Sequence, residues 1–175
     1  MKPFALCFTG VSGSGKTTLA NIVAEQIQQN NMPVQIIDGD ILRKQLGSLF
    51  GYTREEREKQ SRIVRVLAKY LLEHGINVIL AIVTPYEEFR GVMREFFGES
   101  YLEVWTKCSY EVLVARDVKG YYKMALQNQL DNFNGVNDTF EEPQHADLIV
   151  QTDHDTPEQC GEQILALIKE RGYIM

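Results

Sequence analysis

The sequence predicts an α/β fold in which a parallel sheet of five strands lies between two layers of helices. Short runs of β-branched and aromatic residues alternate with longer stretches of helical periodicity. The short runs are continuously apolar, as expected for strands that crossover helices cover on both faces. Repeated strand–helix–strand units build a doubly wound α/β domain, whose ligands bind beyond the carboxyl ends of the strands.

The elements in the first half of the chain follow one another closely. The apolar run FALCFT predicts a strand at 4–9, and the helix expected at 17–29 follows a glycine-rich stretch. VQIID predicts a second strand at 34–38. The charged run REEREK, with pairs three and four residues apart, starts a helix at 55–74. VILAIV predicts the third strand at 78–83.

The second half repeats the pattern. A helix is expected at 87–97, followed by the strand YLEVWT at 101–106 and a helix at 109–116. DLIVQ predicts the fifth strand at 147–151. The last helix, at 157–168, begins with a proline, which is a typical first-turn residue.

One long irregular region, residues 118–146, is rich in glycine, asparagine, lysine and aromatic residues. A loop of this length inside a compact domain is usually functional or mobile. We expect an active-site lid with a short helix at 121–129, and the alternative is a disordered insertion. Residues 1–175 are otherwise expected to form a single domain.

Charge and cysteine usage exclude several classes of partner. The chain has 18 Lys and Arg against 24 Asp and Glu, a net charge of −6, which opposes attraction to nucleic acids and anionic membranes. No stretch approaches the length of a membrane span. The three cysteines, Cys7, Cys108 and Cys160, have no metal or redox spacing and predict reduced thiols in the cytoplasm.

A phosphate-binding loop follows the first expected strand. GVSGSGKT, at 10–17, matches the pattern GxxxxGK[ST] and opens a helix, which is the structural context that this motif requires. Lys16 would reach the β- and γ-phosphates of ATP, and the Thr17 hydroxyl would bind Mg²⁺. The residues expected around the ATP phosphates are Gly10, Ser12, Gly13, Ser14, Gly15, Lys16, Thr17 and Thr18.

The end of the second strand brings acidic and basic side chains to the same edge of the sheet. Phosphoryl transfer to a hydroxyl needs a carboxylate near the attacking oxygen and cations on the acceptor, so we assign these roles to Asp40 and Arg43. The third strand ends at Thr84 rather than at an aspartate, which leaves Asp38 and Asp40 as Mg²⁺ carboxylates. A turn with a helix cap is the alternative interpretation of this segment.

Several ordered motifs resemble the adenylylsulfate kinase family, over residues 4–168. They are GVSGSGKTT, IIDGDILR, GYTREER, HGINVILAIVTPY, ARDVKGYYKMA and FNGVNDTFE. The resemblance implies the three-layer fold of the P-loop nucleotide kinases. It also implies transfer of the γ-phosphoryl group of MgATP to the ribose 3′-hydroxyl of adenosine 5′-phosphosulfate.

The resemblance further implies roles on the acceptor side. Asp40 and Arg43 would face the acceptor nucleotide, and Arg57 would help to hold its phosphosulfate. Tyr52 and Phe133 would sandwich its base.

Other residues carry roles on the lid and at the ATP phosphates. The resemblance places Lys119 and Lys123 on the lid near the phosphates. Arg116, at the end of a helix, has two interpretations, as an ATP contact or as a partner of terminal carbonyls.

Thr84 stands where the family has a serine that is sometimes described as phosphorylated. We interpret it as a strand-end hydroxyl, because in-line transfer needs no such intermediate.

The chain departs from the family mainly on the acceptor side. Gln60 replaces a usual asparagine, and we include it among the acceptor-binding residues. Ile63 replaces a usual arginine, and Asn137 replaces a common aspartate. In the lid, Val118 replaces a proline. These changes leave open an alternative acceptor, such as cytidine diphosphoramidate. A nucleotide-sensing module without turnover is a third hypothesis, and the resemblance is compatible with a homodimer.

Overall fold

The computed structural model describes residues 2–174 and contains a parallel sheet in the order β2-β3-β1-β4-β5. Its strands are β1 (Ala5–Thr9), β2 (Val34–Asp38), β3 (Asn77–Ala81), β4 (Tyr101–Lys107) and β5 (Leu148–Gln151). All five lie where the apolar runs predict them, and the expected fold class is confirmed. Because the chain crosses over in a parallel sheet, the carboxyl ends of the strands meet at one edge.

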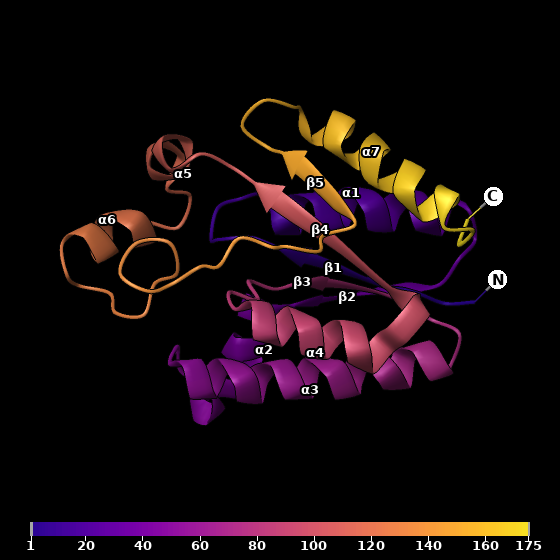
Figure 1. Cartoon of the computed structure of the whole chain (residues 1–175), viewed down its shortest axis with the longest axis horizontal. Helices are drawn as coiled ribbons and strands as arrows, with labels where there is room; N and C mark the ends of the chain where they lie inside the picture. The colour runs from indigo at the N-terminus through magenta and orange to yellow at the C-terminus, as the bar shows by residue number, and fades with distance from the viewer. Residues whose placement is uncertain (1, 175) are drawn as a thin grey trace.

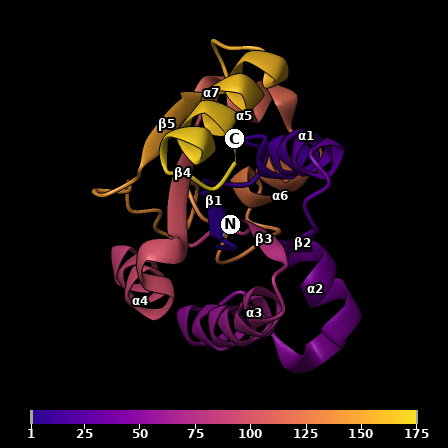
Figure 2. The same cartoon turned by 90° about the vertical axis from the view of Figure 1, so that its right-hand side faces the viewer.

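Helices cover both faces of the sheet, so the domain has three layers (Figures 1 and 2). The helix pair α1 (Lys16–Gln29) and α7 (Pro157–Glu170) lies on one face. The opposite face carries α2 (Gly39–Leu46), α3 (Arg54–Glu73) and α4 (Glu87–Phe97). Two one-turn 3-10 segments follow α2 and α4, at Gly47–Leu49 and Gly98–Ser100. Among residues 2–174, no helix is long and apolar enough to cross a membrane.

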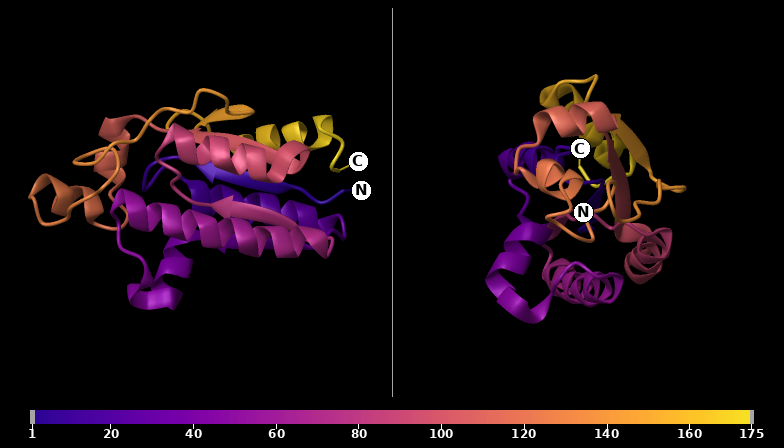
Figure 3. Two further views of the ribbon diagram at one scale, coloured as in Figure 1. Left: turned by 60° about the horizontal axis from the view of Figure 1, so that its bottom comes forward. Right: turned by 90° about the vertical axis from the view of Figure 1, so that its left-hand side faces the viewer.

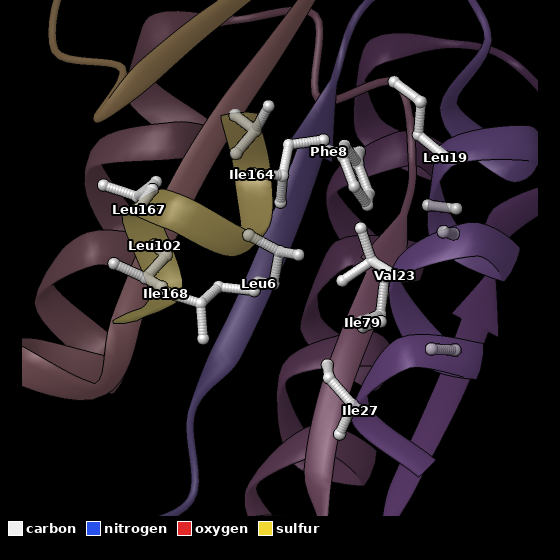
Figure 4. Packing of buried hydrophobic residues seen from close by; sticks show 14 of the residues in the cluster. Leu6, Phe8, Leu19, Val23, Ile27, Ile79, Leu102, Ile164, Leu167 and Ile168 are labelled. Carbon is white, nitrogen blue, oxygen red and sulfur yellow. The ribbon is translucent and has the colours of Figure 1, made fainter. Parts of the chain in front are cut away.

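The central strand explains why its apolar run is continuous. Leu6 and Phe8 pack into the core shared with α1 and α7, whereas Cys7 packs on the opposite face with α3 and α4. Figure 4 shows the first cluster, in which side chains of α1 and α7 meet over β1. Burial on both faces removes the polar alternation that a one-sided sheet would show.

The lid region lies beyond the carboxyl ends of the strands, at the end of the molecule opposite the two termini (Figures 1 and 3). It follows α5 (Tyr110–Arg116) and contains the short helix α6 (Tyr121–Leu126), which ends three residues before the expected boundary. The carboxylate of Asp117 caps α6 by accepting hydrogen bonds from the backbone N of Tyr122 and Lys123, at 2.9 and 3.1 Å.

Two local expectations were incomplete. The segment after β2 forms the helix α2, because an Asp38 carboxylate oxygen accepts hydrogen bonds from the backbone N of Asp40 and Ile41. The cap alternative therefore applies to Asp38. In addition, β3 ends at Ala81, two residues early, because the chain leaves the sheet before Thr84, which adopts a left-handed conformation with φ 41°.

Candidate active site

A cavity of about 330 Å³ opens at the carboxyl ends of β1, β2 and β3, between the phosphate loop, α3 and the lid. It brings together most of the predicted site residues, although they come from distant parts of the chain. The predicted residues that line it are Ser12, Gly13, Gly15, Lys16, Thr17, Thr18, Asp38, Asp40, Arg43, Tyr52, Arg57, Gln60, Thr84, Lys119 and Phe133. Gly10, Ser14, Arg116 and Lys123 are not among the lining residues.

Gly10 and Ser14 fasten the phosphate loop to β4. The Ser14 and Thr106 hydroxyls are hydrogen-bonded at 2.7 Å, and the Thr106 hydroxyl also donates to the backbone O of Thr9. Gly10 lies so close that a Cβ there would meet Thr106 Oγ1 at 2.3 Å, and its φ is +151°. The first glycine of the motif is therefore required for close backbone packing.

Lys16 folds back over the phosphate loop. Its Nζ donates to the backbone O of Gly10 and Val11, at 2.8 and 2.7 Å. Burial lowers the pKa of Lys16 to about 8, and the nearby charge of Lys119 acts in the same direction, against the opposing effect of Asp40 and Asp38. The ammonium group thus lies in a desolvated position on the phosphate side of the cavity.

Thr17 and Asp38 form a pair of oxygen ligands at the strand edge. The Thr17 hydroxyl donates to Asp38 Oδ2 at 2.7 Å, while Asp38 Oδ1 caps α2. Mg²⁺ prefers oxygen ligands and is usually held by one or two protein groups together with substrate phosphates and water. The donor set at this edge therefore fits an Mg²⁺ ion that accompanies ATP.

Asp40 is ion-paired with Lys119 of the lid, although 79 residues separate them. Burial tends to raise the pKa of Asp40, but the hydrogen bond and charge of Lys119, with the charges of Lys16 and Arg43, outweigh it and lower the pKa. The same contact raises the pKa of Lys119 despite its partial burial. Asp40 is consequently an ionised carboxylate at neutral pH.

Arg43 is held from three sides. It donates to the backbone O of Gly51 and to Gln60 Oε1, and its guanidinium lies 4.4 Å from the centroid of the Tyr52 ring. Gln60 is oriented in turn by a 2.8 Å hydrogen bond to the backbone O of Gly39. Among the described residues, the buried Nε of Arg43 has no hydrogen-bond partner. An unpaired buried donor is unfavourable, and this one belongs to a guanidinium that lines the cavity.

Arg57 links the two aromatic residues of the predicted acceptor site. Its Nε donates to the backbone O of Tyr52 and its Nη2 to the backbone O of Asn132, each at 2.8 Å. Asn132 directly precedes Phe133, so one buried guanidinium spans both walls of the cavity. Sequence reasoning missed Asn132, because only its backbone carbonyl takes part and no side-chain pattern reveals that.

Thr84 points its hydroxyl toward the sheet. Thr84 is 5% exposed, and its Oγ1 donates to Thr9 Oγ1 at 2.7 Å. Its backbone O accepts a 2.7 Å hydrogen bond from the buried Arg90. The buried hydroxyl therefore contacts the end of β1 at the edge of the cavity, and Thr84 lies three residues beyond the end of β3.

Arg116 and Lys123 lie away from this cavity. Arg116 Nη2 donates to the backbone O of Thr152, after β5, and Nη1 approaches Cys108 Sγ at 3.6 Å. Lys123 is exposed on α6. Conversely, the cavity is also lined by residues that sequence reasoning missed, including Phe89, Tyr121 and Asn134.

The three-layer fold and the phosphate loop together define a P-loop kinase of the nucleotide-kinase type. A family model described as adenylylsulphate kinase matches residues 2–151. The chain belongs to the adenylylsulfate kinase family. It is therefore an ATP-dependent enzyme that transfers a phosphoryl group to a hydroxyl.

Individual relatives match nearly the whole chain. An adenylyl-sulfate kinase of Halothermothrix orenii is 38% identical over 173 residues, which cover 99% of this chain and 93% of that protein. Another, of Myxococcus xanthus, is 38% identical over 98% of this chain and 94% of its own length. The structure of the Mycobacterium tuberculosis APS kinase CysC in complex with AMPPNP and APS has a TM-score of 0.90 at 26% identity, with coverage of 96% and 98%.

Proposed function

We propose that this enzyme transfers the γ-phosphoryl group of ATP to the ribose 3′-hydroxyl of adenosine 5′-phosphosulfate, which gives 3′-phosphoadenylyl sulfate. The observation that carries this proposal is a single cavity that holds a phosphate loop at one end and the Asp40–Arg43–Arg57 set at the other. The similar M. tuberculosis enzyme binds an ATP analogue and APS together. The enzyme uses ATP and Mg²⁺.

On the ATP side, the phosphate loop supplies most of the binding. The phosphate-loop residues that line the cavity, Ser12, Gly13 and 15–18, surround the β- and γ-phosphates with their backbone N–H groups, and Lys16 neutralises the charge that develops on the transferred group. Thr17 and Asp38 would hold Mg²⁺, which would supply positive charge against the negative charge of the ATP phosphates. We also propose that Arg116 contacts ATP at the outer end of the phosphate loop. Its hydrogen-bond partner Thr152 lies beside this loop, since a Cβ built on Gly15 would meet the Thr152 side chain at 3.6 Å.

On the acceptor side, Asp40 takes the proton of the attacking ribose hydroxyl. Burial tends to raise its pKa, but the charges of Lys16 and Arg43 still lower it after Lys119 has left, so it stays ionised at neutral pH, as a general base requires. The guanidinium of Arg43, which lines the cavity, attracts the acceptor anion, and Arg57 adds a second positive charge beside it. Tyr52 and Phe133 bind the base by stacking.

Residues 118–146 act as a lid over this reaction. Lys119 must leave Asp40 before that carboxylate can accept a proton from the substrate, so acceptor binding and lid movement are linked. Once released, Lys119 moves onto the phosphates, together with Lys123. Closure excludes water, which would otherwise compete as the phosphoryl acceptor.

The pKa of Lys16 gives the enzyme a testable pH dependence. Because burial lowers this pKa to about 8, the free enzyme carries the Lys16 charge below pH 8 and loses it above. ATP needs the charged form, so we expect its Kd to rise with pH above that point, toward about tenfold per pH unit. Titration of AMPPNP with Mg²⁺ from about pH 6.5 to about pH 9.5 measures this. The matched variant is Lys16→Arg, which stays charged and should show a flat profile; a flat wild-type profile would contradict the assignment.

The acceptor is tested by measuring ADP release from MgATP with a panel of acceptors. The panel comprises adenosine 5′-phosphosulfate, AMP, CDP and cytidine diphosphoramidate, and the product masses are read by mass spectrometry. We expect turnover with adenosine 5′-phosphosulfate and the addition of one phosphoryl group at the 3′ position. The absence of ADP release with that nucleotide would refute the proposed substrate.

A different nucleotide acceptor is the second candidate, and one residue in the cavity favours it. Gln60 replaces a usual asparagine and orients Arg43, so it can change where the acceptor anion sits. Asn137 only braces the lid, through the backbone of Phe133 and Leu130. Ile63 is 36% exposed on α3 and does not line the cavity. Turnover with a cytidine compound alone in the same panel would select this candidate.

We also propose that the enzyme forms a homodimer in the cytoplasm. The stripe Ile63, Val66, Leu67 and Tyr70 is exposed along one face of α3, at spacings of three and four residues. Such an apolar stripe is typical of a surface that a partner covers. A monomeric mass in light scattering would refute the dimer.

The three free cysteines and the use of ATP support a cytoplasmic location for the enzyme, and fractionation of cells would test that location.

A further inference from the structure

The lid helix α6 carries a buried tyrosine that contacts both ends of the cavity. Tyr122 is 2% exposed. Its hydroxyl donates a 2.8 Å hydrogen bond to the backbone O of Ser12 in the phosphate loop, 110 positions away in the chain. Its ring meets the ring of Phe133 edge-on, with the centroids 5.0 Å apart and an interplanar angle of 86°. The neighbouring carboxylate of Asp117 holds the backbone N of Tyr122 at 2.9 Å.

The hydroxyl controls the orientation of a phosphate-binding peptide. The carbonyl of Ser12 and the N–H of Gly13 belong to one peptide unit, which is planar and trans, since no cis peptide occurs among residues 2–174. The two groups therefore point in opposite directions. Because the Ser12 carbonyl points toward Tyr122, the Gly13 N–H points away from Tyr122. Gly13 itself lines the cavity.

The fit between Tyr122 and this peptide is close. Gly13 adopts φ +79°, and a Cβ there would lie 3.8 Å from Tyr122 Cε2. Burial raises the pKa of Tyr122, so its hydroxyl remains a donor throughout the neutral range. Among the described residues, the Tyr122 hydroxyl is the only side-chain group that donates a hydrogen bond to the Ser12 carbonyl.

The ring supports the wall on which the acceptor base is proposed to stack. Phe133 is 9% exposed and lines the cavity. Tyr122 and Tyr121 both approach it at steep angles, 86° and 81°, which is the preferred arrangement for aromatic pairs. Rings that pack edge-on in this way restrict Phe133 to one orientation.

We propose that Tyr122 is a positioning residue for both substrates: its hydroxyl orients the Ser12–Gly13 peptide toward the ATP phosphates, and its ring orients Phe133 toward the acceptor base. The inference rests on the proposed function for its acceptor half. Docking of α6 and ordering of the phosphate loop are linked through this one side chain.

Two substitutions separate the two contacts. Tyr122→Phe keeps the ring and removes the hydroxyl, so the Kd for MgAMPPNP should rise about threefold to tenfold while the Kd for the acceptor stays within about twofold. Tyr122→Leu removes both contacts, so both Kd values should rise. The control is Tyr110→Phe, whose ring lies 6.3 Å from that of Tyr122 and which is 44% exposed; neither Kd should change.

Calorimetric titration with MgAMPPNP and, separately, with adenosine 5′-phosphosulfate provides the two Kd values, and thermal unfolding is measured alongside. An unchanged nucleotide Kd in Tyr122→Phe would overturn the proposal. In Tyr122→Phe, an equal rise of both Kd values with a fall in Tm would also overturn it, because that pattern is loss of packing. Nucleotide titration needs no acceptor, so a wrong acceptor assignment would appear separately, as wild-type protein that does not bind adenosine 5′-phosphosulfate.

Discussion

Replacing Lys16 with alanine is expected to reduce kcat/KM by about 10²- to 10³-fold or more. Lys16 lies at the phosphate end of the cavity and supplies the one side-chain cation of the loop itself. In phosphoryl transfer, charge develops on the transferred group, and a positioned cation stabilises it most in the transition state. Acceptor-dependent ADP release, measured at saturating and subsaturating MgATP, gives the change.

The matched control for this variant is Lys44→Ala. Lys44 is an exposed lysine on α2 and does not line the cavity. It should retain wild-type turnover, whereas near-normal activity of Lys16→Ala would contradict the role of the phosphate loop. Thermal unfolding of both variants shows whether the loss arises from the fold, since the Lys16 side chain contacts only two loop carbonyls through its ammonium.

Replacing Asp40 with asparagine is expected to lower kcat by about 10²- to 10⁴-fold and to leave the Kd for MgATP within about twofold. An amide keeps the shape of the carboxylate but cannot accept the proton of the ribose hydroxyl. Single-turnover measurements with adenosine 5′-phosphosulfate, and separate titration with MgAMPPNP, distinguish the two effects.

The comparison that sharpens this prediction is Lys119→Ala, which removes the partner of Asp40 but keeps the carboxylate. Because Lys119 is also proposed to move onto the phosphates, Lys119→Ala should lower kcat as well, but by less than the loss of the base in Asp40→Asn. Equal losses in the two variants would contradict the role of Asp40 as the base. Equal losses of kcat and nucleotide affinity in Asp40→Asn would instead indicate structural damage.

Local patterns predicted the strand order along the chain because their causes are local. Each apolar run marks a strand, and the two-sided burial of Leu6, Cys7 and Phe8 explains why β1 has no alternation. The helix α2 was missed because Asp38-Gly39-Asp40 is typical of a turn, and the cap that starts the helix depends on which way the Asp38 side chain points. At β3, Ile82 and Val83 keep strand-like composition after the chain has already left the sheet.

The same distinction between local patterns and contacts of distant segments applies to the site residues. Residues 10–18 could be predicted because glycine conformation, helix start and lysine lie within one short segment. The bridge from Arg57 to Asn132 joins segments that are 75 residues apart, so no spacing pattern encodes it. The placement of Lys123 outside the cavity likewise depends on the path of the lid, and that of Arg116 on the position of α5 beside Thr152.

The sequence by itself determined an α/β fold with a phosphate-binding loop, because hydrophobic periodicity and backbone conformational preference act over a few residues; the kinase class came from the resemblance of its ordered motifs to adenylylsulfate kinases. Only the tertiary structure decided how the proposed acceptor end is built: which carboxylate caps a helix and which pairs with Lys119, how Gln60 orients Arg43, and how Tyr122 joins the lid to the phosphate loop. Those contacts form between side chains and backbone groups far apart in the chain, and their energies depend on burial and direction, which exist only after the chain has folded.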